Sequence, residues 1–565
     1  MALVQQKMWG AAIAVLLLCS VAASVHGQQQ QCRLGDSLAA EIRSQLAPDA
    51  LVLLPFSAAY MRDVVLRSTN FQSYPQVIVH PAKVKDVVAA VRFAAKNNLT
   101  ISVKGTGHDY NGRCSSDGSL NINTRLLNDV FFDVRQNKTF FGAGATFSDI
   151  IKPAVLKHGR AVVSGHDLTV GPGGCLLGGC HGALARLHGL GADNVQSIVL
   201  VTPTGQLVKA SSRGVHQMNT LPNGDLDFKE GKQITSDTSL FWALRGGGGG
   251  TLGVVVQFGM QLVPAPTAVQ TVTVTWLLYD SQGKQIRDIF DAFVFNASFW
   301  QALGPTWAAW SVGSVPRNCS APQGISSGTA SSCAGQAALS FVYVGNDPLA
   351  VDKTPGIRAI LNYRAPWVSD MTYYTTKTSY RSYYDFMYHN ADTSNYQRQF
   401  VSNVFLSPQD MNPSATGRLF TALETMQRVA AVPLAGPDSF ETLGFVVSLV
   451  GGGAVPGHPE AAKTSISRAF RSFAAELVLT AGGKDPDWDL RAYQAVSDAI
   501  LPLYKLYPGS YQNEVSSAEG YNRVPDWQAR FWGDNVERLL VVKRQYDPQG
   551  RMVVPYGLGW SGQEQ

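Results

Sequence analysis

The sequence predicts an α+β protein of two folded units, with the boundary near Pro266. Three observations support this fold class. The chain has 565 residues, which is more than one hydrophobic core usually serves. A strand–helix–strand pattern begins at Gln76, and long alternating stretches replace it after Pro266. Hydrophobic residues at 45% and charged residues at 15% leave ample material for both cores.

The first unit opens with a β–α–β pattern. The apolar run QVIVH starts at Gln76, and the stretch after it places Val87, Val88 and Val91 on one helical face. A second β-rich run, LTISV, starts at Leu99. This order is typical of two parallel strands joined by a helix.

Three further elements follow in the first unit. Residues 146–149, TFSD, form a capping box that predicts a helix ending at Gly159. The runs 197–201 and 206–209 flank the turn TPTG and predict a hairpin. The segment TLGVVVQFGMQLV then predicts a strand that stops at Pro264.

The second unit is predicted to be an antiparallel sheet covered by helices. Alternating stretches such as QTVTVTWLLY and amphipathic helical patterns continue to about Ser510. The tail from Trp527 predicts a helix ending at Asp547 and Pro548. We therefore divide the chain into residues 1–27, 28–266, 267–510 and 511–565, the last being a segment that returns to the first unit.

Residues 1–27 have the pattern of a signal peptide, which predicts a secreted protein. Lys7 supplies the positive region, the apolar stretch runs from Ala11 to Ser24, and small residues precede Gln28. The stretch is shorter than a membrane span needs. The net charge of +5 comes without a dense Lys/Arg run, so we expect neither nucleic acid nor membrane as a partner.

The cysteines are expected to form structural disulfides in the secretory pathway. Seven cysteines minus Cys19 of the signal leave six, which allow 15 connectivities. Cys319 and Cys333 form the simplest pair, and no CxxC spacing suggests a metal site. Glycosylation sequons, which suit a secreted glycoprotein, occur at Asn98, Asn137, Asn296 and Asn318.

Three glycine-rich loops contain the candidate chemistry. They span residues 103–113, 164–182 and 241–255. Glycines let a ligand approach the backbone, and successive N–H groups suit a pyrophosphate. The sequence has no P-loop motif. Gly105 and Gly107 could begin a dinucleotide fingerprint, but His108, Asp109 and Tyr110 follow them, so the third glycine of that motif is missing. The loops predict either a large anionic ligand held by backbone or tight turns in a β-rich protein.

The order of these loops resembles one family. KGTGHDY, TVGPGGCLLGGCHG with HGLGADNV, and LFWALRGGGGGTLGVV are similar to the p-cresol methylhydroxylase (PCMH) or vanillyl-alcohol-oxidase type of FAD-binding domain. Berberine bridge enzyme-like flavoproteins contain this domain. The C-terminal GSYQNE and WGDNVERLLVVKRQYDP also resemble that family. The resemblance implies an FAD-dependent oxidoreductase.

The resemblance also implies the FAD-binding residues. In the family, the histidine of the first loop bonds to the 8α-methyl of the flavin, which assigns this role to His108. Its imidazole suits the role because the neutral form is a good nucleophile. The other residues that the resemblance places at FAD are Lys104, Gly105, Thr106, Gly107, Asp109, Asp167, Thr169, Gly171, Gly173, Gly174, Gly179, Gly182, Asp193, Asn194, Gly253, Val254, Val255 and Asn513.

Two positions depart from the family pattern. Bicovalent members have a cysteine two residues before TVG, and this chain has Asp167 there. A carboxylate cannot form the thioether, so FAD is expected to be attached through His108 only. Pro172 stands between TVG and GG, where family members differ in their reaction with O2. This leaves oxidase and dehydrogenase behaviour as alternatives.

Oxidation of an alcohol needs a base for the hydroxyl proton. Glu514 is the favoured base and Tyr511 the alternative, while Tyr110 matches a tyrosine beside the base in sugar-oxidising relatives. If residues 511–514 form a strand, Tyr511 and Asn513 face one way, and Gln512 and Glu514 face the other.

The tyrosine-rich stretch from Met371 to Asn390 could stack on a substrate ring or pack across strands. The predicted activity is oxidation of an alcohol or sugar hydroxyl, with a small-molecule substrate and O2 giving H2O2. Alternatives are a dehydrogenase with another acceptor and a secreted binding protein that has lost turnover.

Overall fold

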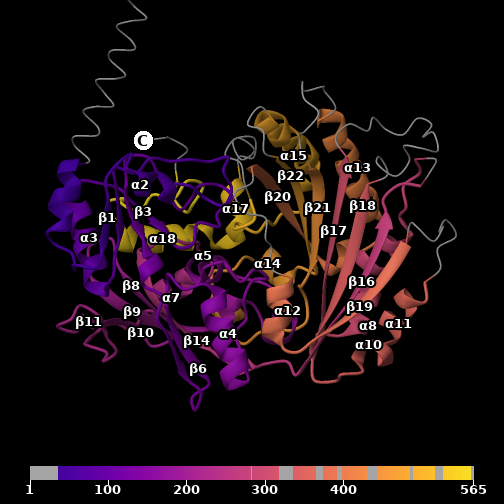
Figure 1. The fold of residues 1–565 in the computed structure, drawn as a ribbon, viewed down its shortest axis with the longest axis horizontal. Coiled ribbons are helices and arrows are strands. Elements are labelled where there is room, and N and C mark those ends of the chain that lie inside the picture. Colours follow the sequence, from indigo (N-terminus) through magenta and orange to yellow (C-terminus); the bar gives the residue numbers. More distant parts are fainter. Residues whose placement is uncertain are drawn as a thin grey trace, which may run out of the picture.

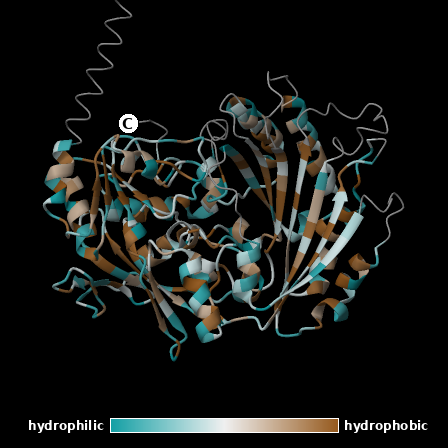
Figure 2. Ribbon diagram, in the orientation of Figure 1, coloured by the Kyte–Doolittle hydropathy of each residue, from teal (hydrophilic) through white to brown (hydrophobic). Residues whose placement is uncertain are grey.

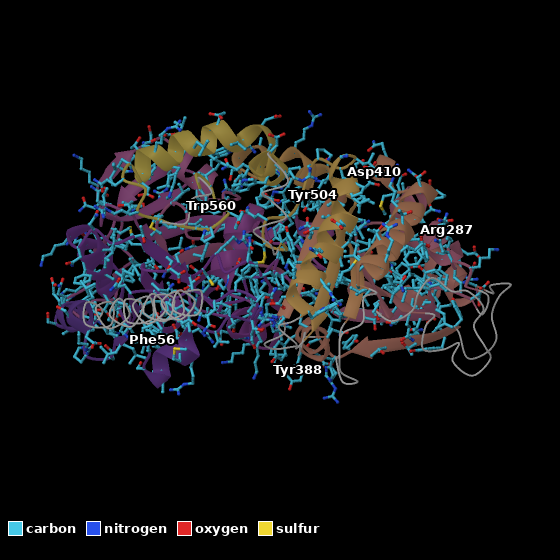
Figure 3. All side chains as sticks on the ribbon, turned by 90° about the horizontal axis from the view of Figure 1, so that it is seen from above. Phe56, Arg287, Tyr388, Asp410, Tyr504 and Trp560 are labelled. Carbon is cyan, nitrogen blue, oxygen red and sulfur yellow. A yellow bond between two sulfur atoms is a disulfide. The ribbon has the colours of Figure 1, made fainter. Side chains whose placement is uncertain are left out.

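The computed structural model describes residues 36–280, 283–316, 335–363, 373–390, 398–430, 442–483, 488–515 and 526–560. Figure 1 shows two parts side by side, one indigo to purple and the other pink to orange. The yellow C-terminal helices α17 (Trp527–Trp532) and α18 (Val536–Tyr546) lie with the first part (Figure 1). Seen from above, Phe56 lies in the first part and Arg287 at the far end of the second (Figure 3).

A four-stranded sheet of order β1-β2-β4-β3 begins the first part. Its strands are β1 (Leu51–Leu53), β2 (Val77–His80), β4 (Leu120–Asn123) and β3 (Ile101–Lys104). The predicted β–α–β unit is confirmed, because β2 and β3 both pair in parallel with β4. The crossover helix is α3 (Val84–Lys96), whose face with Val87, Ala90 and Val91 is buried.

A seven-stranded antiparallel sheet completes the first part, in the order β13-β10-β9-β8-β14-β6-β5. The predicted hairpin is present as β8 and β9. The predicted capping box is also confirmed, since Thr146 and Asp149 cap α4 (Phe147–His158), which ends at Gly159 with a φ of 60°. The strands are β5 (Val130–Asp133), β6 (Lys138–Gly142), β8 (Val195–Val201), β9 (Leu207–Ser211), β10 (Gly214–Gln217), β13 (Gln233–Thr235) and β14 (Val254–Gln261).

The second part contains another seven-stranded antiparallel sheet, of order β19-β16-β18-β17-β21-β22-β20. The strands are β16 (Ala268–Leu277), β17 (Trp307–Pro316), β18 (Gln336–Gly345), β19 (Tyr373–Tyr380), β20 (Arg398–Leu406), β21 (Thr442–Leu449) and β22 (Ala475–Gly483). The predicted antiparallel sheet is therefore confirmed, and with the mixed first part it gives the α+β class.

Helices α13 (Pro413–Ala430) and α15 (Asp489–Tyr504) cover one face of this sheet. Alternate residues such as Val272, Phe341 and Leu477 pack into the core beneath these helices. The hydropathy colours alternate along the strands accordingly (Figure 2). The intervening residues face the first part, so the opposite face of the sheet is available to form a site.

The remaining elements are short. They are α2 (Ala58–Asp63), η1 (Thr124–Leu126), β7 (Arg160–Ala161), α5 (Pro172–Gly178), α6 (Ala185–His188), η2 (Gly191–Asn194), β11 (Asn219–Thr220), β12 (Leu226–Asp227), α7 (Ser239–Leu244), β15 (Val263–Pro264), η3 (Phe290–Val294), α8 (Ala297–Leu303), α10 (Ala350–Lys353), α11 (Pro355–Leu361), α12 (Tyr383–His389), η4 (Pro408–Asp410), η5 (Ala461–Lys463), α14 (Arg468–Ser472), α17 (Trp527–Trp532), η7 (Gly533–Asn535) and α18 (Val536–Tyr546).

The C-terminal segment packs on the first part. The single helix predicted from Trp527 is wrong in one respect, because Gly533, with a φ of 53°, ends α17 and begins η7, which precedes α18. Beyond α18, Met552 forms a parallel bridge with Ile101 at the edge of β3. The amide of Ile101 donates to the carbonyl of Arg551 at 2.7 Å. The end of the chain thus contacts the strand that leads into the first glycine-rich loop.

One disulfide, Cys175–Cys180, joins two cysteines of the second glycine-rich loop. Cys114 makes no disulfide with another cysteine of the described ranges. The pair Cys319 and Cys333, suggested by the sequence, lies outside the described residues, as does the predicted signal peptide. Within the described part of the chain, every helix is too short or too polar to cross a membrane.

Candidate functional site

A cavity of about 680 Å³ lies between the two parts of the molecule. This volume is within the range of small-molecule and cofactor sites. Residues of all three glycine-rich loops line one side, and strands β16 to β19 and β21 line the other. The C-terminal segment contributes residues 511–514. The predicted loops therefore meet at one site although they are far apart in the sequence.

The first loop is shaped by Asp109. The chain leaves β3 at Lys104 and turns at Gly107, which has a φ of 77°. The Asp109 carboxylate accepts hydrogen bonds from the backbone amides of Asn111 and Arg113 at 2.8 and 2.9 Å. It also accepts from the Arg113 guanidinium at 2.6 Å. These bonds hold the loop so that His108 and Tyr110 line the cavity.

The second loop is joined to the first by two contacts. The amide of Gly171 donates to Thr106 Oγ1 at 3.0 Å. A Cβ atom at Gly171 would lie 3.0 Å from Thr106 Cγ2, so only glycine allows this approach without a shift. Thr169 Oγ1 lies 2.8 Å from His108 Nε2. These contacts fix the position of His108 relative to the start of α5.

The third loop is held by α5 and by the C-terminal segment. The amides of Gly246 and Gly248 both donate to the carbonyl of Leu177, at 3.0 and 2.9 Å. The carbonyl of Gly246 accepts from Gln512 Nε2 at 2.7 Å and from Trp532 Nε1 at 3.0 Å. The loop is therefore anchored from both sides, with Gly248, Gly249 and Gly250 facing the cavity.

Residues 511–514 form a turn, so the expected alternation of a strand is wrong here. The amide of Glu514 donates to the carbonyl of Tyr511 at 3.2 Å, which closes the turn. Asn403 of β20 fixes it through hydrogen bonds with the backbone of Tyr511 and Glu514. Because the backbone turns, Tyr511, Gln512, Asn513 and Glu514 all line the cavity.

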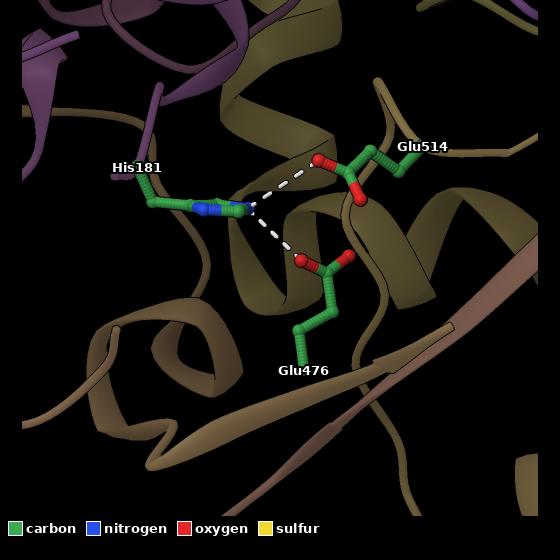
Figure 4. A group of neighbouring side chains, drawn as sticks. All are labelled: His181, Glu476 and Glu514. Atoms are coloured by element: carbon green, nitrogen blue, oxygen red, sulfur yellow. Dashed lines mark ion pairs between the residues drawn. The ribbon is translucent and has the colours of Figure 1, made fainter. Parts of the chain in front are cut away.

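Glu514 belongs to a buried group with His181 and Glu476, shown in Figure 4. His181 Nε2 lies 2.9 Å from Glu476 Oε2 and 3.7 Å from Glu514 Oε1. Glu476 projects from β22 toward the first part and is completely buried, whereas 34% of the Glu514 side chain is exposed. Glu514 is therefore the carboxylate that a ligand in the cavity can reach.

Burial controls the protonation of this group. It raises the pKa of Glu476 to about 8, and burial followed by repulsion from Glu476 raises the pKa of Glu514. Burial lowers the pKa of His181, which the charge of Glu514 partly offsets. A neutral imidazole thus lies between two carboxyl groups that hold protons at higher pH than usual. Such shifts are typical of groups that exchange protons with a ligand.

Tyr511 is held beside this group. Its ring lies 4.9 Å from the His181 ring, centre to centre. Its hydroxyl oxygen accepts from the amide of Cys180 at 3.2 Å and from Asn513 Nδ2 at 3.0 Å. Burial is the main cause that raises the pKa of Tyr511. The two donors occupy the oxygen lone pairs, which directs the hydroxyl proton away from the backbone.

The opposite wall of the cavity is uncharged and rich in hydroxyl groups. Its side chains on the sheet are Thr271, Thr273, Trp310, Val312, Ser340, Val342, Thr378, Tyr380, Val446 and Ser448. His166 of the second loop lies over Trp310, with ring centres 4.6 Å apart. From the tyrosine-rich stretch, Tyr380 reaches the cavity, while Tyr373 donates to the carbonyl of Ile360. The packing role is therefore observed for Tyr373, and Tyr380 lies where a ligand in the cavity could contact it.

The structure brings most of the predicted site residues together. The predicted residues that line the cavity are Gly105, Thr106, Gly107, His108, Asp109, Tyr110, Asp167, Gly171, Gly173, Gly174, Gly253, Val255, Tyr511, Asn513 and Glu514. Seven others lie outside the lining: Lys104, Thr169, Gly179, Gly182, Asp193, Asn194 and Val254.

The residues outside the lining have structural contacts instead. Lys104 Nζ donates to the carbonyl of Asp63. Asn194 Nδ2 donates to the carbonyls of His188 and Leu190, both at 2.9 Å. Asp193 forms a bidentate pair with Arg471. At Gly182 a Cβ atom would lie 2.2 Å from the carbonyl oxygen of Ser164.

Sequence reasoning missed His181, Glu476, Gln512 and Arg67. His181 directly follows a predicted glycine loop and could have been noted from its position. Glu476 is a single carboxylate in an otherwise apolar strand, ELVL, and that pattern marks a buried acid. Arg67 carries no local signal, since only the fold brings it to Asp167, at 3.3 Å.

Two family models match this chain. One is described as an FAD binding domain and matches residues 75–211, which include the first two glycine-rich loops. The other, described as berberine and berberine like, matches residues 510–550 and includes Tyr511 and Glu514. The chain is also 28% identical over 550 residues to the FAD-linked oxidoreductase ffsJ of Aspergillus flavipes, covering 88% of this chain and 78% of that protein. These matches support a berberine bridge enzyme-like FAD-linked oxidoreductase.

Solved structures agree with this fold. The Physcomitrella patens BBE-like 1 protein superposes with a TM-score of 0.71 at 16% identity, covering 93% of this chain and 98% of that one. A xylooligosaccharide oxidase from Myceliophthora thermophila, solved with xylobiose, gives a TM-score of 0.69 at 18% identity and covers 93% and 99%. The expected PCMH-type fold is thus confirmed.

The cavity of this FAD-linked oxidoreductase fits the cofactor. Gly174 lines the cavity, and a Cβ atom there would meet no other protein atom within 4 Å. Gly105, Gly173, Gly249 and Gly250 line the same cavity, so backbone without side chains borders a shared space. Such a surface suits a pyrophosphate and a flat ring that lie against the main chain.

The raised pKa of Glu476 predicts a pH-dependent stability for the oxidoreductase. Folded Glu476 keeps its proton up to about pH 8, whereas the unfolded chain releases it near the ordinary value of 4.5. Between these values the folded state binds more protons, so its free energy of unfolding falls as pH rises. We expect Glu476→Gln to flatten this slope in urea-unfolding midpoints measured from about pH 5 to about pH 8.

The wild-type chain is the matched control, because the two proteins differ at residue 476 alone, and the difference therefore reports Glu476 together with its effect on the pKa of Glu514. A variant that loses stability with pH as steeply as the wild type would show that Glu476 is not protonated in the folded state.

Proposed function

We propose that this protein oxidises an alcohol or sugar hydroxyl with FAD attached through His108 only, and passes the electrons to O2 to give H2O2. The observation that carries the proposal is the shared cavity. His108 and the glycine-rich loops line one side of it, and Glu514 and Tyr511 reach the same space. A proton acceptor and a cradle for the cofactor are therefore next to each other.

When bound, FAD supplies the ring that accepts the hydride. In our proposal Glu514 accepts the proton of the substrate hydroxyl. Asn403 holds the backbone of Glu514, while His181 and Glu476 lie behind its carboxylate. Because Glu476 keeps its own proton up to about pH 8, the proton that Glu514 accepts leaves from the exposed part of the Glu514 side chain, toward the cavity.

Tyr511 is the alternative proton acceptor. Its oxygen accepts two N–H donors, which would stabilise a phenolate in this buried position. Tyr110 lines the cavity from the first loop, and we propose that it contacts the same substrate hydroxyl.

The opposite wall supports a neutral, hydroxylated substrate. Thr273 and Ser340, which lie 2.9 Å apart by their hydroxyl oxygens, offer hydrogen bonds without charge. Trp310 and Tyr380 offer aromatic faces for an apolar ring surface. The likeness to an oligosaccharide oxidase supports a sugar hydroxyl in particular.

Attachment through His108 alone follows from Asp167, which stands where a thioether would need a thiol. Pro172 begins α5 between two residues of the cavity lining, Gly171 and Gly173, at the position where family members differ in their reaction with O2. A dehydrogenase that uses a quinone is the alternative that this position keeps open.

The proposal predicts a yellow protein whose flavin stays with the chain after acid precipitation. His108→Ala is expected to fold and to release its flavin into the supernatant, since the imidazole is the only attachment. The measurement is flavin fluorescence in the pellet and the supernatant. Flavin in the supernatant of the wild-type protein would exclude covalent attachment.

A panel of alcohols, oligosaccharides and amines, scored for H2O2, tests the activity. Turnover with a quinone but without H2O2 would favour the dehydrogenase. No turnover in a flavin-loaded protein would favour a binding protein.

We also propose that the protein is secreted. The signal-peptide pattern of residues 1–27 supports this, as does the exposed sequon residue Asn98. Protein in the medium of an expressing host, with Gln28 as the first residue, is the expected result.

A further inference from the structure

Asp167 occupies the position at which bicovalent relatives have the cysteine that bonds to the flavin. In this structure hydrogen bonds connect it to His108 through Thr169. Thr169 Oγ1 donates to Asp167 Oδ1 at 2.8 Å. The same oxygen lies 2.8 Å from His108 Nε2. Asp167 Oδ2 pairs with Arg67 at 3.3 Å. Four side chains thus form a continuous line from a guanidinium to the imidazole.

We propose that Asp167 and Thr169 are positioning residues that prepare His108 for its bond to FAD and remove its proton as that bond forms. The proposal rests on the covalent attachment proposed above. It explains why a carboxylate occupies this position, beyond the statement that it cannot form a thioether.

The direction of the hydrogen bonds fixes the tautomer of His108. The Thr169 hydroxyl gives its only proton to the Asp167 carboxylate, so toward His108 it can only accept. His108 Nε2 must therefore carry the proton and donate it. The lone pair then resides on Nδ1, which becomes the nucleophile. Arg67 keeps Asp167 an acceptor by stabilising its charge.

The same four side chains account for the proton that His108 loses when it bonds to FAD. A bond forms between His108 Nδ1 and the 8α carbon of FAD, and a C–H bond breaks at that carbon. The flavin takes up the electron pair, which O2 then removes, and the two protons released complete H2O2. One proton comes from the 8α carbon and the other from His108 Nε2. The latter passes to Thr169 Oγ1 as Thr169 passes its own proton to Asp167.

Asp167 could instead serve only to shape the backbone of its loop, and two variants distinguish that role from proton removal. Asp167 Oδ1 also accepts from the amide of Thr169 at 2.7 Å, a contact that shapes the turn before Gly171. Thr169→Val removes the hydroxyl and keeps this amide. Asp167→Asn keeps an acceptor for the amide and removes the charge. Both variants thus preserve the turn. Thr169→Val breaks the line to His108, whereas Asp167→Asn keeps the line but leaves no carboxylate to take up the proton.

The experiment adds FAD to apoprotein in air and follows covalent attachment, by flavin fluorescence of the acid-precipitated chain over time. We expect Thr169→Val and Asp167→Asn to attach flavin at least about 10-fold more slowly than the wild type. Thr169→Ser, which keeps the hydroxyl, should attach it at a rate close to that of the wild type. Non-covalent FAD binding, read from flavin absorbance before precipitation, should be similar in all three variants.

Covalent attachment in Thr169→Val and Asp167→Asn at the wild-type rate would overturn the relay and leave the His108 bond intact. Loss of non-covalent FAD binding together with attachment would assign Asp167 the structural role instead. A wild-type protein without covalent flavin would overturn the attachment itself and with it the relay.

Discussion

Glu514→Gln is expected to lower kcat/KM by about 100- to 10,000-fold while the protein keeps its flavin. The amide has the size of the carboxyl group but cannot accept a proton from the substrate. Of the two carboxyl groups beside His181, Glu514 is the one that lines the cavity. Its backbone contacts with Asn403 and Tyr511 do not involve the carboxylate, so the turn should remain.

Two matched variants distinguish the role of Glu514 as proton acceptor from the roles of Glu476 and Tyr511. Glu476→Gln changes the other carboxylate, which lies outside the cavity lining, and a smaller loss is expected there. Tyr511→Phe removes the alternative acceptor and keeps the ring on His181. Steady-state turnover and flavin content are measured for all three. If Glu514→Gln keeps wild-type turnover and Tyr511→Phe does not, the base is Tyr511.

The local elements were predictable because short-range chemistry determines them. The Thr146 cap needs only Asp149 three residues later, and the β8–β9 hairpin needs only its turn. The glycine-rich loops were predictable for a related reason, since each encodes its own backbone shape. Their meeting at one cavity was implied by the family resemblance alone.

The acid group could not be predicted in the same way. His181, Glu476 and Glu514 come from three distant segments, and only the position of β22 in its sheet brings Glu476 to His181. The alternation rule failed at residues 511–514, because Asn403 and Gly246 bind this segment as a turn. Tertiary contacts determined its shape, and they also brought both candidate bases to the cavity.

Asp193 shows how a family resemblance can differ from the geometry. The resemblance placed it at FAD, but its side chain is 0% exposed and lies outside the cavity lining. Its two oxygens accept from Arg471 of α14 at 2.6 and 2.7 Å. The backbone amide of Leu190 adds a third bond, at 2.9 Å. Asp193 therefore connects the loop before β8 to the segment before β22.

Arg471→Met is consequently expected to lower the free energy of unfolding by about 3–5 kcal/mol. Methionine keeps much of the apolar stem, but it leaves the Asp193 carboxylate buried without its cation. The charge cannot reach water, so the cost is that of an unpaired buried ion rather than of one lost contact. Urea-unfolding midpoints and slopes measure the change.

Arg213→Met is the control for this change, because Arg213 makes a similar pair with Glu230, with both bonds at 2.6 Å. The Arg213 side chain is 64% exposed and Glu230 keeps a second partner, Lys209, at 2.8 Å, so a loss below about 1 kcal/mol is expected. Adding Asp193→Asn to Arg471→Met should restore part of the stability, since it removes the unpaired charge. Equal losses in the two single variants would show that burial of Asp193 does not determine the strength of its pair.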